Sequence, residues 1–136
     1  MATTTKKTKL EIKSWDEKPY RELPDGSKFT RADVVLAGGD DGVELEATWE
    51  ALLYYDPDGN STYSGLMHAT GTLDGREGTF VMHGTGTYDG TTARIESTVV
   101  PGSATGDLAG LTGTAKHAST HADYPFWPFA FSYDLT

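Results

Sequence analysis

The stretch ELEATWEALLYYDPDG, residues 44–59, carries two conflicting hydrophobic periods. Four of its apolar residues fall at helical spacing, but every second residue from Val43 to Tyr55 is apolar, as in a half-buried strand. A strand here pairs through the DPDGN turn with the following STYSGLMHATG, whereas a lone helix would have to lie on the sheet or plug a barrel. The pattern therefore predicts a strand over 43–55, and its outward residues include Glu44, Glu46 and Glu50.

Glycine-rich turn sequences divide the rest of the chain into short segments. PDGS, GGDDG, DPDGN, LDGREG, YDGTT and PGSATGDLAG are such turns, and the segments between them are mostly ~8 to 14 residues long. These segments are rich in Thr, Val, Tyr, Phe and Trp, which favour strands. We expect one domain over residues 1–136, with 1–7 flexible and about eight strands at 8–15, 28–37, 43–55, 61–73, 78–88, 91–100, 104–117 with a break, and 126–135.

Hairpin geometry predicts which residues face each other across neighbouring strands. A two-residue turn at residues 89–90 places Phe80 opposite Val99, and a four-residue loop at 74–77 places Ala69 opposite Met82. Pairing Tyr55 near Ser61 brings the apolar sides of two further strands together. One face of this sheet then collects the apolar side chains Met67, Ala69, Leu73, Phe80, Met82, Ile95 and Val99.

Several stretches resemble DUF3224, a family of bacterial proteins of unknown function. They are KSWDEKPYREL, EALLYYDPDG, GLMHATGTLDGREGTFVM and above all VVPGSATGDLAGLTG, and they follow one another in unbroken order. The resemblance implies a single antiparallel barrel of the allene oxide cyclase type, related in shape to lipocalin-like barrels, and it implies no established activity. The C-terminal HADYPFWPFAFSYDLT departs from the family in its aromatics and prolines, and we expect it to reshape one barrel mouth.

The interior of an eight-stranded barrel is just wide enough to be filled by side chains or to hold one small ligand. Ala47, Ala51 and Ala69 lie among large inward residues and leave space, and buried tyrosine hydroxyls need partners that a ligand or water supplies. The alternative is that aromatic side chains fill the interior and the tyrosines tip outwards. The predicted ligand-binding residues are Trp49, Tyr55, Tyr63, Met67, Met82, Trp127, Phe129, Phe131 and Tyr133.

Candidate catalytic groups are sparse. The predicted registers align His68, His83 and Glu96 across neighbouring strands, but on the polar outer face, where a solvated triplet is the favoured interpretation. Glu50 serves acid–base chemistry only if a bulge near Gly42 turns it inwards. The glycines of GTGTYDG and GTLDG are interpreted as turn makers, since no P-loop or dinucleotide fingerprint surrounds them. We expect no metal and no cofactor.

Composition narrows the partners. The 136 residues include 20 acidic and 11 basic side chains, and the net charge of −9 disfavours nucleic-acid binding, which depends on basic residues. Cysteine is absent, which excludes disulfides and thiolate metal sites. The N-terminus lacks a signal-peptide pattern and no segment is long enough to span a membrane. We therefore expect a cytoplasmic protein without nucleic-acid or membrane partners, and the sequence is compatible with a homo-oligomer.

Two functions from different classes remain. The first is a small β-barrel that binds an apolar or aromatic small molecule in its interior. The second, implied by the resemblance to allene oxide cyclase-type barrels, is a cofactor-independent isomerase or cyclase whose cavity folds a hydrophobic substrate into a reactive conformation. Whether the protein is an enzyme is left open. Binding is favoured, because likeness of fold alone is a weak basis for assigning a reaction.

Overall fold

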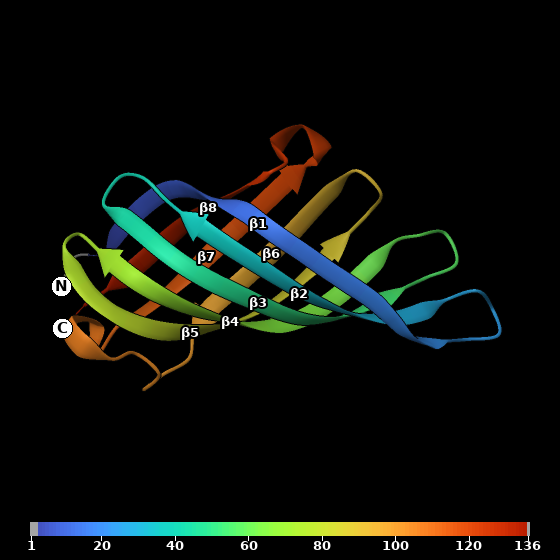
Figure 1. Cartoon of the computed structure of the whole chain (residues 1–136), viewed down its shortest axis with the longest axis horizontal. Coiled ribbons are helices and arrows are strands. Elements are labelled where there is room, and N and C mark those ends of the chain that lie inside the picture. The colour runs from blue at the N-terminus through green and yellow to red at the C-terminus, as the bar shows by residue number, and fades with distance from the viewer. Residues whose placement is uncertain (1–2, 136) are drawn as a thin grey trace.

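The computed structural model describes residues 3–135, which form a closed barrel of eight antiparallel strands (Figure 1). Neighbouring strands follow chain order, and β1 closes the barrel against β8. The strands are β1 (Thr4–Glu22), β2 (Lys28–Gly38), β3 (Val43–Tyr55), β4 (Ser61–Leu73), β5 (Arg76–Tyr88), β6 (Thr92–Val99), β7 (Thr112–Thr120) and β8 (Phe126–Asp134). Two single 3-10 turns, η1 (Gly106–Leu108) and η2 (His121–Asp123), lie in the loops. The predicted all-β barrel is confirmed, and no helix in residues 3–135 is long and apolar enough to cross a membrane.

Strand β3 decides between the two hydrophobic periods of its sequence. Burial alternates residue by residue from Val43 to Leu53, and all three glutamates of the strand are exposed. Tyr55 pairs with Ser61 across the following turn, as predicted. The period of two prevails because one face of the strand meets the core and the other meets solvent.

The predicted register between β4 and β5 is wrong by two residues. Asp74 and Gly75 alone form the turn, both with positive φ, 50° and 82°. This backbone conformation is that of a two-residue hairpin turn, whose twist matches that of the flanking strands. Ala69 therefore pairs with Phe80 rather than with Met82.

The register between β5 and β6 is also displaced by two residues, because the loop there is longer than predicted. The carboxylate of Asp89 accepts hydrogen bonds from the backbone N–H groups of Thr91 and Thr92, at 2.9 and 2.8 Å, and these two bonds hold the wider turn. Tyr88 pairs with Ala93, and Met82 pairs with Val99. Side chains on a strand repeat every two residues, so both displacements preserve the apolar face while changing each cross-strand partner.

Strand β1 is longer than the predicted 8–15. It pairs with β8 only as far as Glu11, and from Ser14 onwards it pairs with β2 alone. The tips of β1 and β2 consequently project beyond β8 at the end of the barrel opposite the chain termini (Figure 1). Residues 4–7, which we predict to be flexible, pair with β8, and residues 1 and 2 lie outside the described part.

Three glycines that are predicted to be turn makers lie within strands instead. Gly71 lies in β4, and Gly84 and Gly86 lie in β5, whereas Gly75 and Gly90 are indeed in turns. A Cβ atom on Gly86 would lie 2.2 Å from the Arg94 carbonyl oxygen and 2.5 Å from the Tyr63 ring. Glycine is required here because the backbone of one neighbouring strand and a ring from the other leave no room for a side chain.

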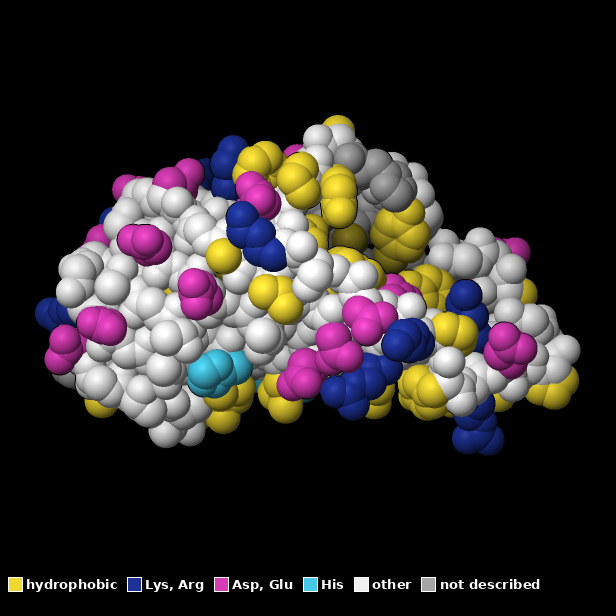
Figure 2. Space-filling view, viewed as in Figure 1, with side chains coloured by type: hydrophobic (Ala, Val, Ile, Leu, Met, Phe, Trp, Pro, Cys, Tyr) yellow, Lys and Arg dark blue, Asp and Glu magenta, His cyan; other side chains and the backbone are white. Residues whose placement is uncertain are grey.

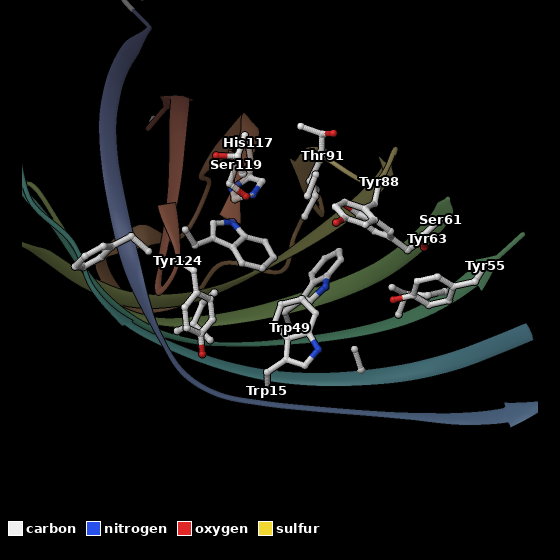
Figure 3. Close-up of a pocket in the computed structure, with 18 residues that line it drawn as sticks. Trp15, Trp49, Tyr55, Ser61, Tyr63, Tyr88, Thr91, His117, Ser119 and Tyr124 are labelled. Carbon is white, nitrogen blue, oxygen red and sulfur yellow. Dashed lines mark hydrogen bonds between the residues drawn. The ribbon is translucent and has the colours of Figure 1, made fainter. Parts of the chain in front are cut away.

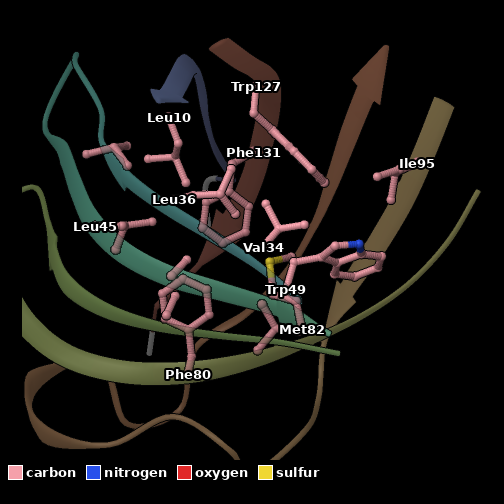
Figure 4. Packing of buried hydrophobic residues seen from close by; sticks show 14 of the residues in the cluster. Leu10, Val34, Leu36, Leu45, Trp49, Phe80, Met82, Ile95, Trp127 and Phe131 are labelled. Atoms are coloured by element: carbon pink, nitrogen blue, oxygen red, sulfur yellow. The ribbon is translucent and has the colours of Figure 1, made fainter. Parts of the chain in front are cut away.

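Buried hydrophobic side chains pack against one another inside the barrel (Figure 4). Phe80 and Phe131 stack at its centre, with ring centroids 5.9 Å apart and planes 20° apart. Leu108 and Leu111, from the connection between β6 and β7, are 0% and 2% exposed. Burial of these two leucines closes this end of the barrel with apolar side chains, and the opposite end is left to form the cavity described next.

Candidate functional site

A cavity of about 270 Å³ opens at the barrel end opposite the chain termini, and we call it the mouth cavity (Figure 3). All eight strands contribute residues to it, together with the loops after β5 and β7. Its lining includes every tryptophan of the chain. The aromatic lining residues are Trp15, Trp49, Tyr55, Tyr63, Tyr88, Tyr124, Phe126 and Trp127.

The rim of the mouth cavity is apolar as well. Trp15 on β1, Tyr124 in the loop before β8 and Phe126 on β8 are 47%, 68% and 38% exposed. Figure 2 shows hydrophobic side chains around a hollow between the top loop and the projecting strand tips. The C-terminal aromatic segment therefore forms part of one barrel mouth.

Two indoles separate the mouth cavity from the packed interior. Trp49 and Trp127 meet edge to face, with centroids 6.2 Å apart, and both also line a second, inner space of about 30 Å³. A space of this size holds about one water molecule. The interior is thus filled at its centre and open at one end. The open volume lies nearer the mouth than predicted from Ala47, Ala51 and Ala69. Of these alanines, Ala69 lines the inner space, while Ala47 and Ala51 line neither.

The predicted ligand-binding residues divide into three groups by position. Those that line the mouth cavity are Trp49, Tyr55, Tyr63 and Trp127. Those that line the inner space, besides the two tryptophans, are Met67, Met82, Phe129 and Phe131. Tyr133 lies at the closed end, where its hydroxyl donates to the Asp74 carboxylate at 2.5 Å.

The hydroxyls of two cavity tyrosines are already bonded within the protein. Tyr63 donates to the Arg94 carbonyl at 3.2 Å, and burial raises its pKa to about 12. Tyr55 donates to the Glu17 carboxylate at 2.6 Å, and burial together with this carboxylate raises its pKa further. The expectation that a ligand or water supplies their partners is therefore wrong for both residues.

Glu17 is a polar group at the mouth that sequence reasoning missed. Its carboxylate accepts hydrogen bonds from the hydroxyls of Tyr55 and Thr30, the latter at 2.8 Å, and from Trp15 Nε1 at 3.0 Å. These three donors fix one wall of the mouth, since charge-assisted hydrogen bonds are the stronger ones. The predicted strand ended at residue 15, so no pattern in the sequence placed Glu17 beside the barrel mouth.

The four candidate catalytic residues lie on the outside of the barrel. His68 pairs with Val81 and His83 pairs with Thr98, so the predicted alignment of the histidines with each other and with Glu96 is wrong. The Glu50 carboxylate lies 3.3 Å from an Arg31 nitrogen. Within residues 3–135, no three His, Asp or Glu side chains are grouped so that they could hold a metal ion. All four candidates are exposed: Glu50, His68, His83 and Glu96.

His117 on β7 lines the mouth cavity, and it is not among the residues predicted from the sequence. It is 8% exposed, and its ring lies 4.5 Å from that of Trp127, centroid to centroid. Its Nε2 shares a hydrogen bond with Ser119 Oγ at 2.8 Å. The i, i+2 spacing puts both side chains on the inner face of the strand, which was the one signal available in the sequence.

Burial sets the protonation state of His117. Desolvation lowers its pKa to about 4, against weaker opposing effects of the Pro128 carbonyl and the Asp123 charge. The imidazole is consequently neutral at pH 7 and can accept as well as donate hydrogen bonds.

The described lining of the mouth cavity contains no Asp, Glu, Lys or Arg. Its polar side-chain groups are hydroxyls, indole N–H groups and the neutral imidazole. Such a lining is chemically suited to an apolar or aromatic group that forms a few hydrogen bonds, and it offers no countercharge to an ion.

Fold and cavity together define a small closed antiparallel β-barrel with an open, aromatic-lined mouth. Residues 6–131 match the family described as "Protein of unknown function (DUF3224)", and the chain belongs to this family. It is similar in fold to the crystal structure of a DUF3224 protein of unknown function from Shewanella oneidensis MR-1, with 22% sequence identity and a TM-score of 0.73. That similarity covers 98% of this chain and 99% of the other. No curated protein matches the sequence.

Proposed function

We propose that this barrel binds a small apolar or aromatic molecule in the mouth cavity. The observation that carries the proposal is the open volume of about 270 Å³ walled by aromatic side chains at one end of an otherwise packed barrel. Ligand pockets for drug-sized molecules range from ~300 to 1,000 Å³, so the expected ligand is smaller than these.

The position of the tryptophans makes this proposal testable by fluorescence. Because Trp15, Trp49 and Trp127 all line the mouth cavity, an aromatic molecule that enters it should change the indole emission. We expect naphthalene to titrate this signal to saturation with micromolar-range affinity. Replacing Ala93, a lining residue on β6, by Phe should abolish the titration. Ala118→Phe, on the exposed face of β7, is the matched control and should bind as the wild type does.

Two results would contradict the proposal. One is an emission signal that does not saturate with naphthalene. The other is saturable binding that Ala93→Phe leaves unchanged, because it would place the ligand outside the mouth cavity.

A cofactor-independent isomerase or cyclase is the second candidate function. The observation in its favour is the hydrogen bond between His117 and Ser119 inside the cavity, a pair that resembles a base with its proton donor. Against it, a general base works best with a pKa near the operating pH, and burial lowers the pKa of His117 to about 4. A ligand recovered from the protein distinguishes the two functions when it is incubated with fresh protein for a prolonged time. If the NMR spectrum of the ligand is unchanged, binding is supported. If a product of equal mass with a new NMR spectrum forms, isomerisation is supported.

A further inference from the structure

The large apolar side chains that are exposed on this barrel fall into two groups by position. One group, at the mouth cavity, is Trp15, Tyr124 and Phe126. The others exposed within residues 3–135 lie on the outer face of β1–β4, and they are 38% to 57% exposed: Tyr20, Val35, Leu52, Tyr54 and Leu66. Apolar side chains gathered on one exposed face indicate an interaction surface.

Strand pairing places large and small side chains side by side on this face. Leu52 on β3 pairs with Ser64 on β4, and Ser64 pairs with Thr85 on β5. Tyr54 begins a second row, whose members on β4 and β5 are both threonines. A hollow of about 350 Å³ lies over these small side chains. The face therefore carries a ridge on β3 beside a trough on β4 and β5.

The row through Ser64 ends in opposite charges. Arg31 on β2 pairs with Leu52, and Glu96 on β6 pairs with Thr85. Across the five neighbouring strands β2 to β6, the row consists of Arg31, Leu52, Ser64, Thr85 and Glu96 in this order. Figure 2 shows this side of the molecule, where acidic, basic and hydrophobic side chains lie close together.

Arg31 keeps donors available for a further carboxylate. It contacts Asp33 at 3.4 Å and Glu50 at 3.3 Å, both through Nη2. A guanidinium carries five N–H donors, and this side chain is 58% exposed. The remaining donors can therefore reach a carboxylate on another molecule.

Rotation about a twofold axis that runs along β4 makes the row through Ser64 complementary to itself. Such a rotation reverses the order of the row, so Arg31 of one copy faces Glu96 of the other, and Leu52 faces Thr85. Each contact occurs twice in the pair. The ridge of each copy enters the trough of the other, as in two sheets packed face to face.

The neighbouring rows fit the same rotation. Leu66 lies on the axis and meets Leu66 of the other copy, while Glu50 faces His83. On the mouth side of the central row, Tyr54 faces Thr87. These rows bring no two charges of the same sign together, and the exposed leucine is buried against its own counterpart.

We propose that the outer face of β3–β5 is a homodimer interface, and that its occupant is a second copy of this chain in the arrangement just described. The charge pattern selects this arrangement, since an axis across the strands through the same row would set Arg31 against Arg31. It also selects the partner, because two chains of net charge −9 repel except where their contact is locally complementary. The interface lies outside the barrel and does not rest on the proposed function.

Sedimentation velocity on the full chain tests the interface. The wild type should convert from monomer to dimer as its concentration is raised to about 1 mM, a range that detects even weak association. Leu66→Glu places two carboxylates against each other on the axis and should weaken the dimer at least about tenfold.

Mixing two charge variants tests which side chains meet across the interface. Arg31→Glu alone sets two carboxylates face to face, and Glu96→Arg alone sets two guanidinium groups face to face, so each variant should be monomeric. In an equimolar mixture, every such contact is again between opposite charges, and dimers should reappear. The matched controls are Lys7→Glu and Glu44→Arg, which make the same charge changes away from the interface and should dimerise as the wild type does.

The far-ultraviolet circular dichroism and the naphthalene titration of every variant should match the wild type, because the mouth cavity is untouched. A protein that stays monomeric up to about 1 mM leaves this face to a different partner and overturns the inference. A dimer that persists in Leu66→Glu, or a mixture that remains monomeric, overturns it as well. Failure of naphthalene to bind would count only against the proposed function.

Discussion

The same substitution at two alanines should have opposite consequences, because one alanine faces the inner space and the other faces the mouth cavity. Ala69 on β4 is 0% exposed, pairs with Phe80 and Ala47, and lines a space of only about 30 Å³. A phenyl ring is far larger than the single water molecule that this space admits. Ala69→Phe should therefore overpack the core and lower the free energy of unfolding by ~1 to 3 kcal/mol.

Ala93→Phe adds the same ring to a residue that lines about 270 Å³ of open volume. The ring can turn into the mouth cavity and bury apolar surface there, so the free energy of unfolding should stay within about 0.5 kcal/mol of the wild type or rise. Binding of an aromatic probe should be lost, because the ring occupies the site.

Urea denaturation followed by tryptophan emission measures both variants. With a slope of ~1 to 3 kcal/mol per molar urea, the Ala69→Phe midpoint should fall by roughly 1 M, whereas that of Ala93→Phe should barely change. Equal destabilisation of the two variants would refute the division into a packed interior and an open mouth. A stable Ala69→Phe protein would show that the interior is more open than the inner space indicates.

Three further perturbations follow from the structure. Gly86→Ala should destabilise the barrel by at least ~1 kcal/mol, because the new Cβ would lie 2.2 Å from the Arg94 carbonyl oxygen and 2.5 Å from the Tyr63 ring. Displacement of the ring should also alter the near-ultraviolet circular dichroism, and an unchanged melting curve would contradict this packing. The pKa of His117 falls from 6.5 to about 4 on folding, so the unfolded chain binds this proton more readily and stability should be lost as pH drops from about 6.5 towards 4. In His117→Phe this loss of stability between pH 6.5 and 4 should be smaller, by on the order of 3 kcal/mol in the free energy of unfolding. Identical pH profiles for the variant and the wild type would show that burial does not lower the pKa of His117. Replacing His68, His83 or Glu96 on the outer face by alanine should change the free energy of unfolding by no more than about 0.5 kcal/mol, as at ordinary surface positions. Loss of a ligand-binding signal in any of these three variants would place function on the outer face.

Hairpin turns show how far local sequence decides a β-structure. The alternation in 43–55 and the DPDGN turn predicted strand β3 and its pairing with β4 correctly. The lengths of the loops at Asp74 and Asp89 were predicted wrongly. The length of a turn depends on the strands that flank it and on side-chain hydrogen bonds such as those of Asp89, and the residues of the turn do not fix it alone. The inner and outer faces survived both errors, since a displacement of two residues restores the same face.

Residues distant in the chain decided where the cavity lies. The alternating pattern identified inward side chains such as Trp49 and Tyr63, but it could not tell which of them meet across the barrel. Phe80 on β5 and Phe131 on β8 fill the centre of the barrel, and these strands are not neighbours. The mouth of the barrel opens where β8 stops pairing with β1.

The sequence by itself determined the class of fold, the order of the strands and the two faces of the sheet, because these follow from a period of two and from turn residues that act locally. Only the tertiary structure decided which polar groups enter the cavity. His117 looks like an ordinary strand residue in the sequence, and it lines the cavity because barrel closure buries it against the Trp127 ring of the neighbouring strand. Burial and the depressed pKa of His117 are properties of that closed arrangement, which no local pattern encodes.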